Sequence, residues 1–120
     1  MKKTILFVED NDQTRDLYTQ ILADEGFSID VVTDGREAYA TLQKKKYDLM
    51  LLDLMMSGMD GLALLDLLKN KKNNAKIVIF SNISPDNVMG KMHGVKISDY
   101  IVKSDTRPDI FVDKIKKLLN

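Results

Sequence analysis

Short apolar runs recur along the chain and divide it into regular segments. Continuous runs lie at 5–8, 49–52 and 77–80, and a more mixed run covers 99–102. Runs of this length are typical of strands that are buried on both faces of a sheet. Residues 27–32 alternate apolar and polar side chains instead, which indicates a half-buried edge strand. The pattern therefore predicts five strands, one of them at an edge.

Amphipathic stretches follow each of these strands and predict five helices. The first presents Leu17, Tyr18, Ile21 and Leu22 on one stripe, and Gly26 suits the left-handed position that ends it. The later helices are marked by Ala38, Tyr39 and Leu42, by Leu62, Leu64, Leu65, Leu67 and Leu68, by Val88, Met89 and Met92, and by Phe111, Val112, Ile115, Leu118 and Leu119.

Start signals precede three of the helices. Asn11 or Asp12 can cap the first helix with a side-chain oxygen. Ser84, followed by a proline, predicts the start of the fourth. Thr106 and Asp109 resemble a capping box at the start of the fifth.

Strict alternation of strands and helices predicts a parallel sheet with right-handed crossovers and helices on both faces. The expected fold is a doubly wound α/β domain of the flavodoxin-like (βα)5 kind, with strand order 2-1-3-4-5. We find no internal repeat or linker, so residues 1–120 are expected to form a single domain.

Composition narrows the class of protein further. Apolar residues make up 44% of the chain, and 18 basic residues balance 18 acidic ones, which argues against a nucleic-acid binder. The apolar runs are far shorter than the ~20 residues that span a bilayer, and no signal peptide is recognised. The absence of cysteine excludes disulfides and thiolate metal sites. A cytoplasmic location is the default expectation.

Four of the five predicted strands end in polar residues. Glu9 and Asp10 follow the first strand, Asp53 the third, Ser81 the fourth and Lys103 the fifth. In an open parallel sheet, ligands bind outside the carboxyl ends of the strands near the point where the strand order reverses. Strands one and three are neighbours there, so we expect the three carboxylates to converge.

Three converging carboxylates require a cation, and hard oxygen ligands without histidine or cysteine favour Mg²⁺. Mg²⁺ accepts phosphate oxygens readily, and a carboxylate can act as a nucleophile toward phosphorus. Phosphoryl transfer also needs partners for the equatorial oxygens, which the Lys103 ammonium and the Ser81 hydroxyl can supply. The strand ends therefore predict phosphoryl transfer to an aspartate.

Taken together, these residues resemble the receiver domain of two-component response regulators. The resemblance is carried by Val-Glu-Asp-Asn at 8–11, Asp-Leu-Met-Met-Ser-Gly-Met-Asp-Gly at 53–61, Ser81, and Tyr-Ile-Val-Lys at 100–103. It covers the whole chain, whose length matches a stand-alone receiver. The resemblance implies that Asp53 is the phosphoacceptor.

The resemblance also implies a metal site. Asp10 would bind Mg²⁺ directly together with Asp53, Glu9 would act mostly through metal-bound water, and the Met55 carbonyl would complete the protein ligands. The side chains of Met55 and the other methionines could be core filler or a soft surface for a partner, and filler is the default interpretation.

A switch is implied as well. Ser81 and Lys103 would hold the phosphoryl oxygens, and Tyr100 would turn inward as Ser81 moves toward the phosphate. The response would be a change in the surface formed by the fourth helix, fifth strand and fifth helix. Because a half-buried tyrosine in a strand is also ordinary packing, this second interpretation of Tyr100 stays open.

The implied partners are a sensor histidine kinase or phosphotransfer protein, and a downstream target protein. No nucleic acid or membrane partner is expected, and the chain is expected to be a monomer or weak dimer. It would contribute to its own phosphorylation and dephosphorylation without being an enzyme in the usual sense. Because no output domain follows Asn120, we expect it to signal through a partner or a phosphorelay.

Three positions depart from the usual pattern of the family. Ser57 replaces a proline, which leaves the loop after Asp53 less stiff. Ser104 replaces the proline after the lysine, and a cis bond before a residue other than proline costs ~2.5–4 kcal/mol, so we expect a trans bond. Asn82 replaces a small residue and is expected to restrict access to Asp53.

Other classes of function fit the sequence less well. A small Mg²⁺ phosphatase with an aspartyl nucleophile usually needs a second acid two residues later, where Met55 stands. A flavin carrier needs a phosphate-binding loop, but Glu9, Asp10 and Asp12 would repel a phosphate. His93 is expected to face solvent, with no phosphohistidine role. A receiver that is not phosphorylated is an alternative that the complete set of residues makes unnecessary.

Overall fold

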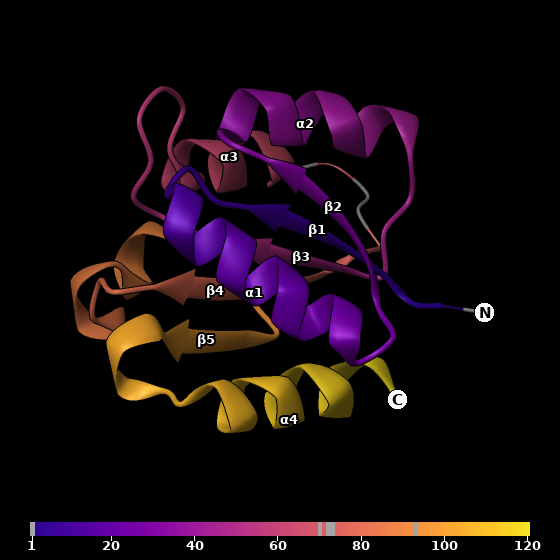
Figure 1. Cartoon of the computed structure of the whole chain (residues 1–120). Helices are drawn as coiled ribbons and strands as arrows, with labels where there is room; N and C mark the ends of the chain where they lie inside the picture. Colours follow the sequence, from indigo (N-terminus) through magenta and orange to yellow (C-terminus); the bar gives the residue numbers. More distant parts are fainter. Residues whose placement is uncertain (1, 70, 72–73, 93) are drawn as a thin grey trace.

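The chain folds as a parallel five-stranded sheet covered by helices on both faces (Figure 1). The computed structural model describes residues 2–69, 71, 74–92 and 94–120, so the expectation for His93 lies outside it. Within these residues the sheet order is β2-β1-β3-β4-β5, which confirms the predicted topology. The strands are β1 (Thr4–Val8), β2 (Ser28–Val32), β3 (Leu49–Leu52), β4 (Lys76–Ser81) and β5 (Asp99–Val102).

The described residues form four α-helices and three short 3₁₀ turns. The helices are α1 (Asp12–Asp24), α2 (Gly35–Lys44), α3 (Gly61–Leu68) and α4 (Pro108–Leu119). The turns are η1 (Pro85–Asn87), η2 (Met89–Lys91) and η3 (Lys103–Asp105). No described helix is long and apolar enough to cross a bilayer.

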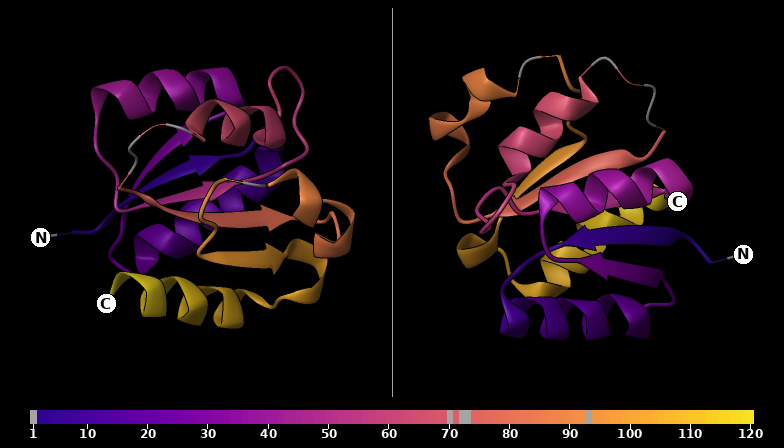
Figure 2. Two further views of the ribbon diagram at one scale, coloured as in Figure 1. Left: turned by 180° about the vertical axis from the view of Figure 1, so that it is seen from behind. Right: turned by 90° about the horizontal axis from the view of Figure 1, so that it is seen from above.

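Alternating side chains of the central strands build two separate cores. Ile5 and Phe7 of β1 pack in the layer with α1 and α4, whereas Leu6 and Val8 pack in the layer with α2 and α3. Successive strand residues point to opposite faces, so a continuous apolar run fills both layers. Figure 2 shows the sheet between its two helical layers.

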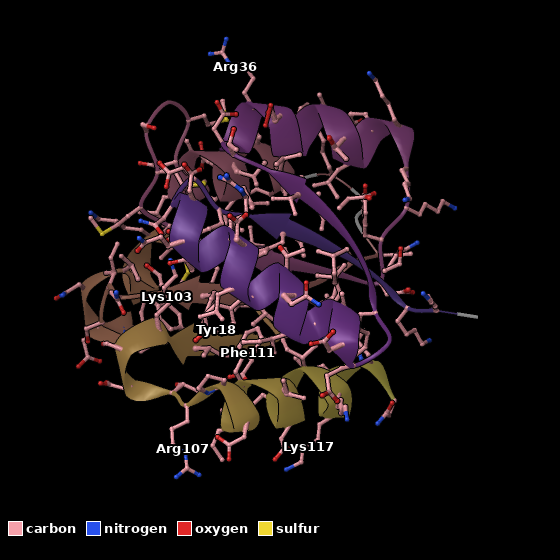
Figure 3. All side chains as sticks on the ribbon, in the orientation of Figure 1. Tyr18, Arg36, Lys103, Arg107, Phe111 and Lys117 are labelled. Carbon is pink, nitrogen blue, oxygen red and sulfur yellow. The ribbon has the colours of Figure 1, made fainter. Side chains whose placement is uncertain are left out.

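An aromatic cluster joins α1 and α4 to the sheet below the carboxyl ends of the strands. The ring centroid of Tyr18 lies 4.8 Å from that of Phe80 and 5.0 Å from that of Phe111. Both contacts are edge-to-face, an arrangement that aromatic quadrupoles favour. Figure 3 shows Tyr18 and Phe111 between the two helices, with Lys103 near them. The cluster gives the neighbouring strand ends a rigid support.

Local signals fix the ends of the first three helices. Asn11 caps α1 by accepting a hydrogen bond from the Thr14 amide at 2.9 Å, which confirms one of the two predicted caps. Asp34 and Asp60 cap α2 and α3 in the same way. Gly26 has a φ of +95°, as expected for the residue that ends α1.

The predicted fourth helix is wrong: residues 85–91 form the turns η1 and η2 instead. Ser84 stands before η1 as predicted, but its side chain makes no capping hydrogen bond. Gly90 favours helix poorly, and Val88 and Met92 are the buried apolar side chains of this segment. A short helix gains most of its stability from packing, and this segment has little apolar surface to bury.

Two further sequence predictions are corrected by the packing. Leu17 is 54% exposed and Leu67 is 42% exposed, because the neighbouring leucines and Tyr18 already fill the contact with the sheet. The capping box at Thr106 is not formed, since Arg107 holds the N-cap position without a side-chain hydrogen bond. The Asp109 carboxylate binds the Arg107 guanidinium instead.

Candidate functional site

Strand register brings the predicted site residues together at the carboxyl ends of the strands. Val8 of β1 pairs with Leu52 of β3, so Glu9 and Asp53 follow side by side. The Asp53 amide donates to the Val8 carbonyl at 3.1 Å. At the other side of β3, Ser81 pairs with the last residue of β5 and therefore lies next to the start of the Lys103 turn.

Lys103 links two buried carboxylates at these strand ends. Its Nζ donates to Glu9 Oε1 at 2.6 Å and to Asp53 Oδ2 at 3.0 Å. Glu9 is fully buried and Asp53 is 5% exposed. Buried charges of this kind persist only when they are paired, because each is costly to remove from water. The geometry therefore makes Lys103 the counter-ion of both groups.

The pKa values reflect this crowded arrangement. Burial raises the pKa of Glu9 to about 7; the Lys103 hydrogen bond works against the rise, and the Asp53 charge adds to it. Burial alone would lower the pKa of Lys103, but the hydrogen bonds and charges of Glu9 and Asp53 outweigh it and raise the pKa. Lys103 is therefore a cation at physiological pH.

Glu9, Asp10 and Asp53 form the acidic cluster expected from the sequence. Each offers one oxygen, and these oxygens all lie within 4.8 Å of one another. The donors are carboxylates without histidine or cysteine, and this chemistry suits Mg²⁺. The cluster carries three acidic groups against one lysine, so the residues present fit a divalent cation.

A cavity of about 280 Å³ opens above this cluster. Such a space accommodates a small phosphoryl group and its surrounding water. All five polar residues predicted at the strand ends contribute to its wall, together with four neighbours. The lining residues are Glu9, Asp10, Asn11, Thr14, Asp53, Met55, Ser81, Asn82 and Lys103.

Ser57 has a role at the site that sequence reasoning missed. Its amide donates to Asp10 Oδ2 at 2.9 Å, and its hydroxyl donates to the same oxygen at 3.1 Å. A proline at this position would have neither group. The loss of the usual proline was the only signal in the sequence, and it did not indicate a contact with Asp10.

Tyr100 lies on β5, the strand that borders the site, and Lys103 directly follows that strand. The Tyr100 hydroxyl donates to the Ile83 carbonyl at 2.6 Å, and the Ile83 amide donates to Ser81 Oγ at 3.3 Å. Burial, followed by the charge of Asp53, raises the pKa of Tyr100. The bond between Lys103 and Ser104 is trans, as expected.

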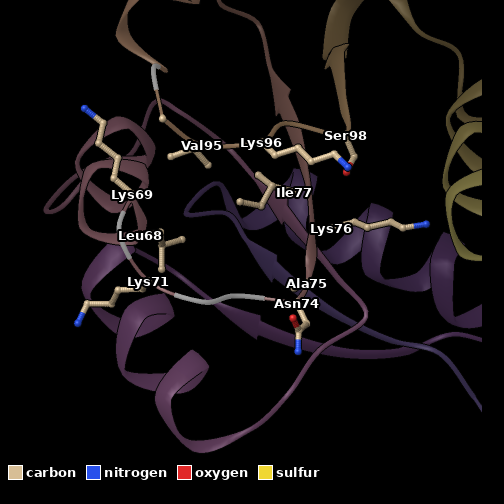
Figure 4. A pocket seen from close by; sticks show the side chains of 11 residues that line it. Leu68, Lys69, Lys71, Asn74, Ala75, Lys76, Ile77, Val95, Lys96 and Ser98 are labelled. Carbon is tan, nitrogen blue, oxygen red and sulfur yellow. The ribbon is translucent and has the colours of Figure 1, made fainter.

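A larger cavity, about 480 Å³, lies near the amino ends of β4 and β5, and four lysines are among the residues that line it. Figure 4 shows that the ammonium groups of Lys69, Lys71, Lys76 and Lys96 point in different directions. Lys69 is paired with Asp66 at 2.9 Å. Among the residues that the structure describes here, these cations do not converge on one point, so they do not form the geometry of a phosphate site.

Comparison with known proteins identifies the class to which this fold and site belong. The family of response regulator receiver domains matches residues 5–115, so the chain belongs to that family. These are receiver domains of two-component systems. The transcriptional regulatory protein HprR of Escherichia coli is 39% identical over 100 residues, covering 82% of this chain and 44% of HprR. The chain spans less than half the length of the first curated relatives it matches.

Solved structures show the same fold. TrrA of Thermotoga maritima, solved in complex with Mg²⁺-BeF, is 34% identical with a TM-score of 0.85, covering 98% of this chain and 99% of TrrA. The chemotaxis response regulator CheY4 of Vibrio cholerae has a TM-score of 0.86 at 23% identity, covering 99% of this chain and 100% of CheY4. The second likeness concerns the fold alone.

Proposed function

We propose that the chain accepts a phosphoryl group on Asp53 from a histidine kinase or a phosphotransfer protein. The observation that carries the proposal is the Lys103 ammonium, which lies 3.0 Å from Asp53 Oδ2 at a cavity that also contains Ser81. A nucleophilic carboxylate, a fixed cation and a hydroxyl donor are the groups that phosphoryl transfer requires.

In the proposed step, one Asp53 oxygen forms a bond to phosphorus while the bond between phosphorus and the donor nitrogen breaks. The electron pair of that bond leaves with the donor imidazole. Lys103 stays protonated, because its pKa is raised, and neutralises negative charge on the transferred group. The Ser81 hydroxyl donates a hydrogen bond to a second phosphoryl oxygen.

Asp10, Asp53 and the Met55 carbonyl would bind Mg²⁺ directly, with Glu9 acting through water. When bound, Mg²⁺ supplies positive charge to the phosphoryl oxygens. Glu9 and Asp10 then orient the ion, and Ser57 fixes Asp10 through two hydrogen bonds to Oδ2.

The signal would leave through the surface formed by η1, η2, β5 and α4, where the sequence predicted a helix in place of the two turns. Tyr100 connects this surface to the site through Ile83 and Ser81. Met89 is 63% exposed and borders an apolar cavity of about 330 Å³ that also contains Tyr100. A two-state change in this region would alter the surface that a target protein contacts. The existence of a target protein, the oligomeric state as a monomer or weak dimer, and the cytoplasmic location all stay predictions.

Phosphoryl transfer is tested by incubating the protein with Mg²⁺ and a small-molecule phosphodonor and measuring its intact mass. We expect one added phosphoryl group on the wild type and none on Asp53→Asn or after chelation of Mg²⁺. Labelling of Asp53→Asn at the wild-type rate would place the acceptor elsewhere. Repeated turnover of a generic phosphoester would favour the alternative phosphatase.

A further inference from the structure

Asn82 and Ser104 are joined by a hydrogen bond beside the proposed site. The Asn82 Oδ1 atom accepts from the Ser104 amide at 2.8 Å. Asn82 directly follows Ser81 at the end of β4, and Ser104 directly follows Lys103 after β5. The bond therefore ties together the two loops that carry the groups proposed to hold the phosphoryl oxygens.

The two residues depart from the family pattern in a way that fits one interaction. A small residue in place of Asn82 would have no side-chain acceptor, and a proline in place of Ser104 would have no amide hydrogen. Either usual residue alone would remove the bond. The asparagine and the serine amide are both needed for the link.

Asn82 also lines the cavity above Asp53, whereas Ser104 does not. The Asn82 side chain is exposed, and an exposed side chain without a partner would sample several rotamers. Its hydrogen bond to the Ser104 amide holds it in one position at the cavity wall. The same bond restrains Ser81, the neighbouring residue that has to approach a phosphoryl group.

We propose that the Asn82–Ser104 hydrogen bond is a latch that slows phosphorylation of Asp53, with Asn82 acting as a positioning residue. The proposal rests on the proposed function, because it assigns a regulatory role at that site. The latch acts through the acceptor oxygen of Asn82, and the volume of the side chain alone does not produce its effect.

Three substitutions separate the hydrogen bond from the side-chain volume. Asn82→Leu keeps similar volume without an acceptor, and Asn82→Ala removes both. Asn82→Asp keeps the acceptor and the shape, and it is used for amide exchange alone because its added charge would itself repel a phosphodonor. Thermal unfolding of each variant confirms that it is folded before any rate is compared.

The first measurement is hydrogen exchange of the Ser104 amide by NMR, which needs no phosphorylation. We expect exchange to be several-fold faster in Asn82→Leu and Asn82→Ala, and close to wild type in Asn82→Asp. Equal exchange in all four proteins would show that the bond does not protect the amide and would overturn the latch.

The second measurement is the rate at which a small-molecule phosphodonor with Mg²⁺ labels Asp53. We expect both Asn82→Leu and Asn82→Ala to be labelled faster by about threefold to tenfold, the range that one net hydrogen bond supports. A wild-type rate in Asn82→Leu would overturn the latch and leave side-chain volume as the cause. An unlabelled wild type would overturn the proposed function and the kinetic part of the latch, whereas the exchange result would still test the bond.

Discussion

Lys103 is the single residue on which the charge balance of the site depends most. It contacts Glu9 and Asp53 through one ammonium group, and both carboxylates are buried. Removing one partner of a buried ion pair leaves charge without compensation, which destabilises a protein far more than loss of a surface pair.

Lys103→Met is therefore expected to lower the free energy of unfolding by about 3 kcal/mol and to abolish rapid labelling of Asp53. Denaturant unfolding and intact mass measure the two effects. Lys69→Met is the matched control, because Lys69 pairs with the exposed Asp66 at the surface, and it should change stability by less than about 1 kcal/mol. A fully stable Lys103→Met would contradict the account of the buried pairs.

Ser57 provides a second prediction at the scale of residues. It donates twice to Asp10 Oδ2, and partners that orient a metal ligand typically affect affinity about 10-fold or more. Ser57→Ala keeps the amide donor, so we expect Mg²⁺ to bind about three- to tenfold more weakly in an NMR titration. Ser84→Ala, which loses no capping bond, should bind Mg²⁺ like wild type. Equal affinity in Ser57→Ala would rule out an orienting role for the hydroxyl.

At the scale of elements, the close packing of α3 against the end of β3 requires a glycine. A Cβ atom on Gly61 would lie 2.4 Å from the Asp53 carbonyl oxygen and 2.8 Å from Leu54 Cα. Both are backbone atoms, so the strand end itself would have to move. The start of α3 and the backbone of Asp53, the proposed phosphoacceptor, are thus in direct steric contact.

Gly61→Ala is expected to lower the free energy of unfolding by about 1–3 kcal/mol, as overpacking does. It should also slow labelling of Asp53, which is displaced with the strand end. Gly90→Ala is the control, because a Cβ there meets nothing within 4 Å. If both alanine variants matched wild type in chemical denaturation, the close approach of α3 would not constrain the site.

The start of β3 is held by a carboxylate whose contribution depends on pH. The Thr4 amide donates to Asp48 Oδ2 at 2.8 Å, and this hydrogen bond is the main cause of the lowered pKa of Asp48. A carboxyl group whose pKa is lower in the folded state stabilises the fold at pH values above its pKa in the unfolded chain, about 3.9 for aspartate. That stabilisation is lost as the pH falls through the folded pKa.

Asp48→Asn should therefore be less stable than wild type by about 1 kcal/mol at neutral pH, and the difference should shrink as the pH falls through the lowered pKa of Asp48. Urea unfolding across this pH range measures the change. The matched control is Asp16→Asn, which replaces an exposed carboxylate of α1. A difference that stays constant from neutral to acidic pH would show that ionisation of Asp48 does not stabilise the fold.

At the scale of the whole molecule, the fold could be predicted because local signals agreed with one another. Four apolar runs and one alternating segment are enough to define a parallel sheet with its edge strand. The failure at residues 85–91 has a physical cause, since Ser84 and its proline indicate where a turn begins but not whether a helix continues. Whether a helix continues depends on tertiary packing, which the spacing of Val88, Met89 and Met92 does not determine.

The candidate site could be predicted to a similar degree. Parallel strands in one sheet place their carboxyl ends on the same side, so the polar residues after four of the strands could be expected to meet there. The contacts of Ser57 with Asp10 and of Asn82 with Ser104 could not be predicted, because they join loops 47 and 22 positions apart. Such bonds depend on loop conformation, which leaves no periodic signal in the sequence.

The central claim is that Asp53 accepts a phosphoryl group, and peptide mass mapping tests this claim most directly. Protein incubated with Mg²⁺ and a small-molecule phosphodonor is digested, and the peptide that carries the added phosphoryl group is identified. We predict that the group lies on the peptide containing Asp53 and that Asp53→Asn carries none. A phosphoryl group on any other peptide, or none on the folded wild type, would contradict the proposed function.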